Sequence, residues 1–443
     1  MARVVVVGGG FAGMAAACRL SGDGHEVTVL EAAPRLGGRA ASFERRGEMI
    51  NCGQHVLLRA CGAAQGFLER IGASDAVSFQ ETLAIPIFCD GERIVLRSWP
   101  LPGIAHLLPG LLLYRPLSGR ERLAAARAGL ALWASRSLRD ETFERWLARH
   151  GQTERILRRF WDPIVIATLN APSSVASFRA TRHVFREAFF VSHGADMGLF
   201  TWPLGDVFRA SLSYVEARGG SGEVNAHAAR VLVRDGRACG IKLADGRELY
   251  ADAVISAVPP DALGEIASGI AQLEAAVTAA QRLVWSPIVN VHLTFDRDAL
   301  GDPFAVGIDS PVQAILRHDR TLVLSQSSAT DLIDLSDEAI VTKLRQALRE
   351  LLPSARDAEF VDSLVLRHLR ATFVPSPGSD ALRPKARTPI PGLYLAGDWT
   401  ATGWPSTIES AVLSGIYAAA ALESDAATCS NPESGIEKSN SEA

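Results

Sequence analysis

The sequence predicts an α/β protein with a parallel sheet and an inserted α+β domain, and three observations lead to this prediction. First, a chain of 443 residues is longer than one hydrophobic core usually supports, so two domains are expected. Second, residues 4–30 read as an apolar strand, a glycine-rich turn, a helix and a second apolar strand, which is the order of a βαβ unit. Third, residues 392–397 form a similar strand near the other end of the chain. The parallel sheet is therefore expected to be discontinuous in sequence.

The first element is a run of valines at positions 4–7, which suits a buried parallel strand. In the turn that follows, Gly8 allows a tight bend, Gly10 lets the backbone approach a pyrophosphate, and Gly13 lets helix and strand pack closely. The N-terminus of the next helix offers unpaired N–H groups and a partial positive charge to the phosphates. The turn is thus predicted to bind a dinucleotide through Gly8, Gly10, Phe11, Ala12 and Gly13.

Glu31 follows the second strand, eighteen residues after Gly13, where its carboxylate can accept both ribose hydroxyls of an adenosine. An acid at this position also disfavours a 2′-phosphate by charge repulsion. Gly37, Gly38 and Arg39 come next, and they would give a second close backbone approach and a cation for the phosphates. This second glycine pair resembles the flavoprotein superfamily that contains amine oxidases, protoporphyrinogen oxidase and phytoene desaturases. The resemblance implies a Rossmann-like domain that binds FAD.

A second motif of this superfamily lies at residues 392–399, where a short strand ends at Gly397 and Asp398. The run from Thr407 onward then reads as a helix. In the superfamily, the aspartate of this motif binds the ribityl chain of FAD, and the following helix points its N-terminus at the flavin. The resemblance therefore implies cofactor contacts from Gly397, Asp398, Thr407 and Ile408.

Residues 228–258 read as a strand, an Asp-Gly turn, a strand and a returning apolar strand closed by prolines. This pattern looks like the β-meander of the same FAD domain and implies a backbone contact from Val231 to the adenine; a generic hairpin is the alternative. The motifs together predict three regions: an FAD-binding domain at 1–75, 215–285 and 385–423, a substrate domain at 76–214 and 286–384, and a disordered tail at 424–443.

The composition excludes several classes of function. The formal net charge is −4 at pH 7, and no cluster of Lys or Arg suggests binding to nucleic acid. The six cysteines form no C-x-x-C pair and show no metal-ligand spacing, so reduced thiols in the cytoplasm and no bound metal are expected. The apolar N-terminal run is expected to be a strand rather than a signal peptide. No window reaches the roughly 18–20 uninterrupted apolar residues of a membrane-spanning helix.

Residues 99–114 form the most hydrophobic stretch outside the nucleotide strands, and their prolines and glycines exclude a long helix. A helix is predicted over about 119–137, and arginines precede and line it: Arg115, Arg120, Arg122 and Arg127. An apolar, broken segment beside a cationic helix fits a surface that dips into an anionic bilayer. This interpretation places the protein peripherally on the inner face of the cytoplasmic membrane; a buried loop beside a solvated arginine face is the alternative.

Two further stretches are candidates for the substrate site. One is a predicted helix that bears Phe160 and Trp161 and ends near Asn170. It would line a cavity with aromatic faces and few polar groups, and Trp202 adds a further aromatic residue. For each aromatic residue taken singly, core packing is the alternative. Gln54 and His55 lie in a loop that is expected to reach the flavin. There the pair could hydrogen-bond the flavin, hold a substrate hydroxyl or have a structural role.

Together these stretches resemble hydroxysqualene dehydroxylase, a family of bacterial hopanoid and squalene synthesis. The resemblance covers residues 2 to about 423 and rests on Gly-Gln-His at 53–55, Phe-Trp-x-Pro at 160–163 and Leu-Asn-x-Pro at 169–172, beside Gly-Asp-Trp-Thr at 397–400. One difference from the family is Asn51-Cys52, where an Asp-Asn pair is expected. The difference argues against a carboxylate role at that position, but it does not argue against the family. The resemblance implies reduction of hydroxysqualene, a long apolar isoprenoid, to squalene with reduced FAD as donor. An association with other enzymes of squalene synthesis would follow.

Loss of an allylic hydroxyl as water would leave a delocalised cation that a hydride can quench. Such a site needs a proton donor, aromatic faces beside the positive charge and exclusion of water. The candidate catalytic residues are His55 and Asp162 as proton donors, Gln54 beside His55, and Trp161, Trp202 and Trp404 as stabilisers of the cation.

Three alternatives share the predicted fold and cofactor. A carotenoid or phytoene-type desaturase would transfer hydride in the oxidative direction on a similar polyene. An amine oxidase commonly places a lysine beside the flavin, and here the candidate is Lys343, on an amphipathic helix that looks solvent-facing. A flavin-binding scaffold in a lipid-synthesis complex would have no turnover of its own.

Overall fold

The computed structural model describes residues 1–137 and 139–430, and the N-terminal valine run lies at the centre of a parallel sheet. The sheet has five strands in the order β10 (Ser221–Glu223), β2 (Glu26–Leu30), β1 (Arg3–Val7), β14 (Ala253–Ser256) and β20 (Leu393–Leu395). Val4 and Val6 pair with β2 on one side and β14 on the other, and both are almost fully buried. This arrangement confirms the predicted α/β fold with a parallel sheet that is discontinuous in sequence.

The turn between β1 and helix α1 (Phe11–Gly22) requires its glycines for steric reasons. Gly8 has a φ of +106°, which side chains rarely permit, and a Cβ on Gly13 would lie 1.8 Å from the carbonyl oxygen of Gly8. Helix α1 therefore begins directly over the end of β1. No side chain caps this helix, so the N–H groups of its first turn are available to an anion.

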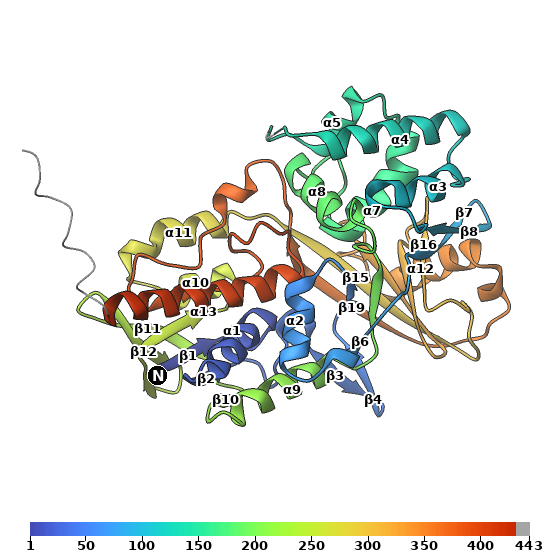
Figure 1. Ribbon diagram of the computed structural model, residues 1–443. Helices are drawn as coiled ribbons and strands as arrows, with labels where there is room; N and C mark the ends of the chain where they lie inside the picture. The colour runs from blue at the N-terminus through green and yellow to red at the C-terminus, as the bar shows by residue number, and fades with distance from the viewer. Residues whose placement is uncertain (138, 431–443) are drawn as a thin grey trace, which may run out of the picture.

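Helix α13 (Ile408–Ser430) packs along α1 (Figure 1). The close approach requires Gly415, where a Cβ would lie 2.2 Å from the carbonyl oxygen of Ala12. The helix continues through residues 424–430, and Asp425 accepts a hydrogen bond of 2.8 Å from the Tyr394 hydroxyl. The prediction of a disordered tail is therefore wrong for residues 424–430, because tertiary contacts extend the helix; residues 431–443 lie outside the described part of the chain.

The strands predicted at 228–258 form an antiparallel meander, and β14 then returns to pair with β1. The meander consists of β11 (Ala228–Arg234), β12 (Arg237–Leu243) and β13 (Glu248–Tyr250). Asp235 and Gly236 both have positive φ and make the tight turn between β11 and β12. Helices α10 (Pro260–Ile266) and α11 (Ala271–Gln281) follow β14.

A mixed sheet of seven strands forms the second half of the fold. Its order is β19 (Phe360–Phe373), β15 (Trp285–Phe295), β18 (Thr321–Ser327), β17 (Ala314–His318), β16 (Phe304–Gly307), β7 (Ala84–Cys89) and β8 (Glu92–Arg97). The long strands β15 and β19 run side by side through the middle of the molecule (Figure 1). Helix α12 (Asp337–Leu351) covers one face, where Val289, Val291 and Leu293 of β15 share its hydrophobic cluster.

Residues 103–137 and 139–189 form a group of short helices beside this sheet, at the upper right of Figure 1. They are η3 (Gly103–Leu107), α3 (Leu108–Leu112), α4 (Gly119–Ala134), α5 (Phe143–Arg149), α6 (Glu154–Ile156), α7 (Asp162–Leu169) and α8 (Phe178–Val184), with π-helical turns η4 (Leu157–Trp161) and η5 (Phe185–Phe189). Ser118 and Glu121 form a capping box that starts α4. Aromatic rings fill the core of the group, in which Trp161 lies 5.6 Å from Phe143 between ring centroids.

Smaller elements join the two sheets. They are the hairpin β3 (Ser42–Arg45) and β4 (Glu48–Asn51), the strands β5 (Val56–Leu58), β9 (Met197–Phe200) and β6 (Val77–Phe79), helices α2 (Gly62–Arg70) and α9 (Leu204–Glu216), and the short turns η1 (Gly38–Ala40), η2 (Ser74–Ala76), η6 (Pro353–Arg356) and η7 (Ser379–Leu382). Helix α9 packs on α1, with the rings of Phe208 and Phe11 4.8 Å apart, although most of α9 lies in the range predicted for the substrate domain.

The described residues contain neither a membrane-spanning helix nor a group of side chains that could hold a metal ion. None of their helices is long and apolar enough to cross a bilayer. None of their His, Cys, Asp and Glu side chains gather in a group of three or more that could hold a metal ion.

Candidate active site

The glycine motifs from the two ends of the chain meet at one edge of the parallel sheet. The guanidinium of Arg39 forms a salt bridge with the carboxylate of Asp398, and it also donates a hydrogen bond of 2.7 Å to the carbonyl of Ala371. Burial would raise the pKa of Asp398, but Arg39 and the hydroxyl of Ser406 outweigh it and hold the pKa below its usual range. Asp398 is therefore a buried, ionised acceptor at this point, as a partner for cofactor hydroxyls must be.

The glycine turn and the second glycine pair form a continuous cradle. The N–H of Gly37 donates to the carbonyl of Gly9 at 2.9 Å, and the nearest atom to a Cβ built on Gly10 is the carbonyl oxygen of Gly37, 3.8 Å away. Gly37 itself has a φ of +118°, so this second turn also needs a glycine. The Cβ positions of Gly8, Gly13 and Gly37 would all collide with backbone. These close backbone approaches fit the pyrophosphate of a dinucleotide.

Glu31 lies beside this cradle, where the sequence places a ribose-binding acid. Its carboxylate accepts hydrogen bonds of 2.8 Å from the N–H of Gly9 and from the N–H of Ala33. The side chain is partly exposed, so its remaining lone pairs can accept ribose hydroxyls. Val231, the predicted adenine contact, is buried on β11 of the meander.

A buried arginine that no sequence motif indicates holds the loop after Asp398. Arg383 donates to the carbonyls of Thr400 at 2.6 Å and Trp404 at 2.8 Å, and to the carbonyl of Asp398 at 3.2 Å. Gly397 has a φ of +138° and precedes this loop. No motif surrounds Arg383 in the sequence, so only its burial in the fold reveals that it positions the Gly397-Asp398 turn.

Glu409 fixes the start of α13, immediately after Thr407 and Ile408. Its carboxylate accepts hydrogen bonds from the N–H groups of Ala63 at 3.0 Å and Ala64 at 2.8 Å, in the first turn of α2. Burial raises the pKa of Glu409. The contact ties α13 to α2, and thereby places the N-terminus of α13 beside the Asp398 loop.

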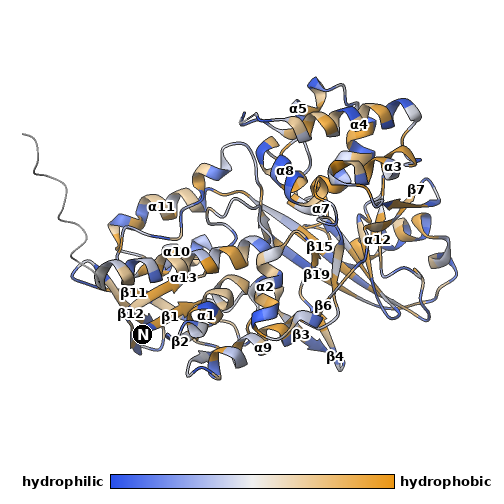
Figure 2. Ribbon diagram, in the orientation of Figure 1, coloured by the Kyte–Doolittle hydropathy of each residue, from blue (hydrophilic) through white to orange (hydrophobic). Residues whose placement is uncertain are grey.

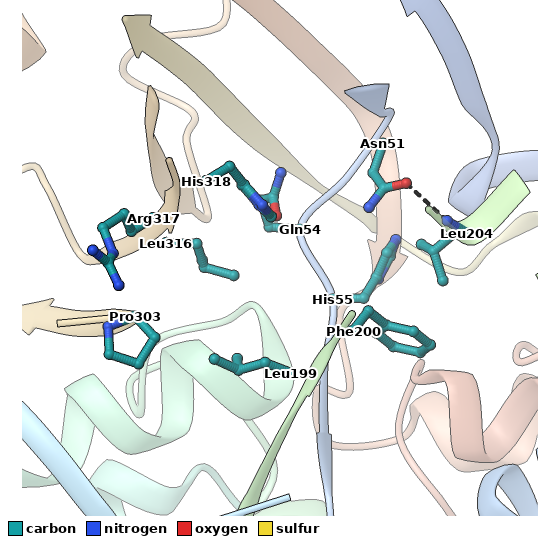
Figure 3. Close-up of a pocket in the computed structure, with 10 residues that line it drawn as sticks. All are labelled: Asn51, Gln54, His55, Leu199, Phe200, Leu204, Pro303, Leu316, Arg317 and His318. Carbon is teal, nitrogen blue, oxygen red and sulfur yellow. Dashed lines mark hydrogen bonds between the residues drawn. The ribbon is translucent and has the colours of Figure 1, made fainter. Parts of the chain in front are cut away.

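A pocket of about 100 Å³ lies between the loop after β4 and the seven-stranded sheet (Figure 3). Its walls combine apolar and neutral polar side chains with one arginine: Asn51, Gln54, His55, Leu199, Phe200, Leu204, Pro303, Leu316, Arg317 and His318. His318 donates to the Gln54 amide oxygen at 3.3 Å. No acidic side chain is among the lining residues that the structure describes. The pocket therefore suits a largely apolar ligand with a neutral polar group.

Asn51 has a structural role that explains its presence where a carboxylate is expected. Its amide oxygen accepts from the hydroxyl of Ser42 at 2.7 Å and from the N–H of Leu204 at 3.0 Å, the bond drawn in Figure 3. An amide oxygen satisfies both donors without placing a charge in the pocket. Asn51 thereby joins the loop of Gln54 and His55 to the start of α9.

The ring nitrogen Nε2 of His55 is buried and has no hydrogen-bond partner among the described residues. Burial, with the nearby His368 and Arg39, lowers the pKa of His55 to about 4, so its imidazole is neutral near pH 7. His368 donates from Nε2 to the carbonyl of Cys52, and burial lowers its pKa too. Arg39 lies close enough to His55 to lower its pKa and pairs with Asp398, so His55 lies on the side of the pocket toward the cofactor motif.

The structure separates the other predicted catalytic residues from this pocket. Trp161 is buried in the helical group, and its indole N–H donates to Gln152 at 3.0 Å. Asp162 accepts from the N–H of Ser173 at 2.8 Å, which is a local contact between α7 and the following turn. Neither residue lines the pocket. Trp161 packs in the aromatic core of the helical group, and Asp162 ties α7 to the turn before α8.

Trp404 and Trp202 also lie outside the pocket lining. Trp404 follows the Asp398 loop, and its ring meets His183 of α8 edge-on at 4.9 Å, so it contacts the helical group. Trp202 is partly buried against the hydrophobic cluster around α1. His318 and His368, which reach this region from β17 and β19, carry no motif in the sequence. The alternation of side chains along β17 and β19 indicates which residues share a sheet face. It does not give the register between strands, so it cannot place these histidines at the pocket.

Comparison with known proteins agrees with this geometry. The model of the family "flavin containing amine oxidoreductase" matches residues 11–422. A hydroxysqualene dehydroxylase of Sinorhizobium fredii is 27% identical over 436 residues, covering 94% of this chain and 97% of that protein. A 15-cis-phytoene desaturase of Solanum lycopersicum is 24% identical over 474 residues, covering 96% of this chain and 78% of that protein. A solved oxidoreductase from Methanosarcina mazei has the same fold, with a TM-score of 0.75 at 20% identity over 94% of this chain and 99% of that one.

The family model matches residues 11–422, which include Gly13 and the second glycine pair of the cradle, the Asp398 loop and the pocket. The buried ionised Asp398 and the glycines without room for a Cβ fit the cofactor of that family. This chain belongs to the flavin-containing amine oxidoreductase family and is an FAD-dependent oxidoreductase.

Proposed function

We propose that this protein reduces hydroxysqualene to squalene. In this reaction the C–O bond of an allylic alcohol breaks, the oxygen leaves as water after taking up a proton, and a hydride replaces it on carbon. The bound flavin, in its reduced form, would supply the hydride. The protein side chains must bind the alcohol, exclude bulk water and orient the reacting carbon.

The observation that carries this proposal is the lining of the pocket in Figure 3. Leu199, Phe200 and Leu316 give it an apolar wall, while Gln54, His55 and His318 give it neutral hydrogen-bonding groups. Gln54 and His318 bond each other, but a substrate that is only a hydrocarbon would leave the buried ring nitrogen of His55 without a partner, which costs about 1–3 kcal/mol. An isoprenoid alcohol matches both parts of the lining.

The same lining disfavours an amine substrate. An ammonium group needs a carboxylate or an aromatic cage, and Arg317 is the charged residue of the pocket wall. Lys343, the candidate lysine of an amine oxidase, lies on α12 and pairs with Asp331 at 2.8 Å. Helix α12 covers the sheet face opposite to the pocket, so Lys343 is not placed beside a substrate.

The role of His55 follows from its neutral ring. A histidine whose pKa is about 4 does not hold the proton that general acid catalysis needs near pH 7. We therefore propose that His55 contributes a neutral hydrogen bond at the reacting centre, on the cofactor side of the pocket, and that the proton reaches the leaving oxygen from another source.

Carotenoid desaturation is the second candidate, because relatives named as phytoene and ζ-carotene desaturases are similar to this chain at 24% identity. One experiment separates the two reactions. The protein with reduced FAD is mixed anaerobically with hydroxysqualene, and the protein with oxidised FAD is mixed with phytoene. We expect flavin reoxidation and one squalene per flavin in the first mixture, and no flavin reduction in the second. The reverse pattern would establish a desaturase instead.

We further propose that the helical group attaches this protein to an anionic membrane surface. Large apolar side chains are exposed on this group and on the segment just before it: Trp99, Leu101, Leu108, Leu112, Leu113, Leu123, Leu130 and Trp133. They lie on or beside α3 and α4, where Figure 2 shows hydrophobic residues at the upper right. Arg115, Arg120 and Arg127 lie in the same stretch. Exposed apolar residues among arginines suit a lipid interface with anionic headgroups.

A further inference from the structure

Strand β15 has two different faces. Val289, Val291 and Leu293 are fully buried against the cluster around α12. Side chains alternate along a strand, so Asn290 and His292 point to the opposite face. Both are buried, with 1% and 9% of their surfaces exposed. Two polar side chains are therefore buried on the sheet face that α12 does not cover.

The strand register connects this face to the pocket. His292 pairs with Val323 of β18, and Val323 pairs with Leu316 of β17, which lines the pocket. Directly paired residues point to the same side of a sheet. His292 also lies close enough to His318, another lining residue, for that residue to affect its titration. Asn290 and His292 do not themselves line the pocket; they lie on the same sheet face as its β17 wall, with β18 between.

Two atoms on this face lack partners. The amide oxygen Oδ1 of Asn290 and the ring nitrogen Nε2 of His292 are buried and have no hydrogen-bond partner among the described residues. Burial, followed by His318 and Arg45, lowers the pKa of His292 to about 4, so its ring is neutral. Buried polar groups are normally paired, and an unpaired one loses its hydration without compensation. An orphaned pair of this kind points to a ligand with a polar atom.

The spacing of the two residues suits a single oxygen. Residues two apart on a strand are separated by about 6.6 Å. Two polar groups that both hydrogen-bond one oxygen lie at most about 5.6 Å from each other, so the two separations are similar. The Asn290 oxygen accepts only, whereas a neutral imidazole nitrogen donates or accepts according to its tautomer. A hydroxyl can donate to the first and bond the second. On the neighbouring strands, Leu364 and Val323 flank His292, and Leu366 and Ser325 flank Asn290.

We propose that Asn290 and His292 form the hydroxyl-binding site of the substrate and decide its specificity for an isoprenoid alcohol over the corresponding hydrocarbon. This inference rests on the proposed function. The site would also favour release of the product, because the hydrocarbon leaves both polar groups unpaired and is bound more weakly than the alcohol. His55, on the cofactor side of the pocket, is a separate group.

The test is a binding measurement that does not depend on turnover. The change in flavin fluorescence of the oxidised holoenzyme is titrated with hydroxysqualene and with squalene, for the wild type, Asn290→Leu and His292→Leu. We expect the wild type to prefer the alcohol at least about tenfold, and each variant to lose about that factor for the alcohol while keeping its affinity for squalene. Should a leucine variant fail to fold, Asn290→Ala and His292→Asn carry the same expectation.

Gln326→Leu is the matched control. Its amide oxygen is also buried and unpaired, but Gln326 pairs with Val289 and therefore lies on the α12 face. We expect this variant to keep the preference of the wild type. Thermal unfolding gives a second readout: removing an unpaired buried polar group should leave the Tm of ligand-free Asn290→Leu unchanged or raised, whereas a structural role would lower it.

The outcomes separate this inference from the proposed function. If wild type prefers the alcohol, the variants lose the preference and Gln326→Leu keeps it, the site is established. Equal binding of alcohol and hydrocarbon by the wild type, or an unchanged preference in both variants, overturns the inference even where hydroxysqualene is reduced. Failure to reduce hydroxysqualene overturns the proposed function alone, because the binding preference is measured without turnover.

Discussion

Arg39 and Asp398 are 359 residues apart in the sequence, and in the structure they form a salt bridge at the edge of the parallel sheet. The pair joins the second glycine motif to the loop before α13. Asp398 is buried, and it is ionised because Arg39 and Ser406 outweigh the effect of burial on its pKa. The cofactor site is therefore an electrostatic arrangement that a neutral residue at either position would disturb.

Asp398→Asn should yield folded protein with little bound FAD. The amide keeps the size of the side chain but removes the charge that both Arg39 and a cofactor hydroxyl would bind. The measurement is flavin absorbance per mole of purified protein, with circular dichroism to verify folding. Asp319→Asn is the control, because Asp319 is a carboxylate in the turn between β17 and β18 whose side chain is 93% exposed. Full flavin content in Asp398→Asn would show that the carboxylate is not a cofactor ligand.

His55→Ala should retain FAD and reduce hydroxysqualene about 10²-fold more slowly, the usual effect of losing one positioned hydrogen bond at a reacting centre. Because the ring is neutral near pH 7, His55→Gln should recover part of the rate. The measurement is single-turnover flavin reoxidation, normalised to bound FAD. A Gln variant as slow as Ala would indicate that a proton from His55 is required. A normalised rate within a few-fold of wild type in both variants would remove His55 from the reaction.

Acidification should destabilise the folded state through His55 and His292. Their folded pKa of about 4 lies below the ordinary histidine value of about 6.5. Between these values the unfolded chain binds more protons, so the free energy of unfolding falls as pH drops from about 6.5 toward 4. At pH 5 each histidine would lower it by about 2 kcal/mol. Urea unfolding at about pH 7.5 and about pH 5 measures the difference.

The matched variants for this pH dependence are His292→Asn and His227→Asn. His227 is exposed, so its replacement should leave the loss of stability between the two pH values as in wild type. His292→Asn should reduce that loss, since the variant has one fewer buried group that must stay neutral. Equal losses in both variants would mean that His292 does not titrate with unfolding.

Replacing Leu108, Leu112 and Leu113 by serine should weaken flotation of the protein with liposomes that contain anionic lipid. All three side chains are exposed, so the change removes apolar area from the proposed lipid-facing surface without opening the core. Leu111 is excluded because it is buried. Val361→Ser and Leu369→Ser on β19 remove equally exposed apolar residues and should leave flotation unchanged. Equal flotation of all variants would assign the helical group to another partner.

Much of the cofactor site could be predicted from the sequence, because its signals are local. Gly8 and Gly13 are required by a turn and a helix contact that span only a few residues, and Glu31 follows at the distance that one βαβ unit fixes. Strand periodicity and the Asp-Gly turn likewise predicted the meander. In these cases the steric constraint and the residues that satisfy it are close together in the chain.

The pocket was decided by tertiary structure. Trp161 and Asp162 carry a recognisable motif, yet packing places them in the helical group, where the aromatic core and the Ser173 contact use them. Arg383, His318 and the Asn290–His292 pair have no motif, and their neighbours come from strands whose register depends on pairing across the whole sheet. The sequence by itself determined the FAD fold, because glycine sterics and strand alternation act locally. Only the tertiary structure decided which polar groups are buried together, because burial and register result from contacts between distant segments.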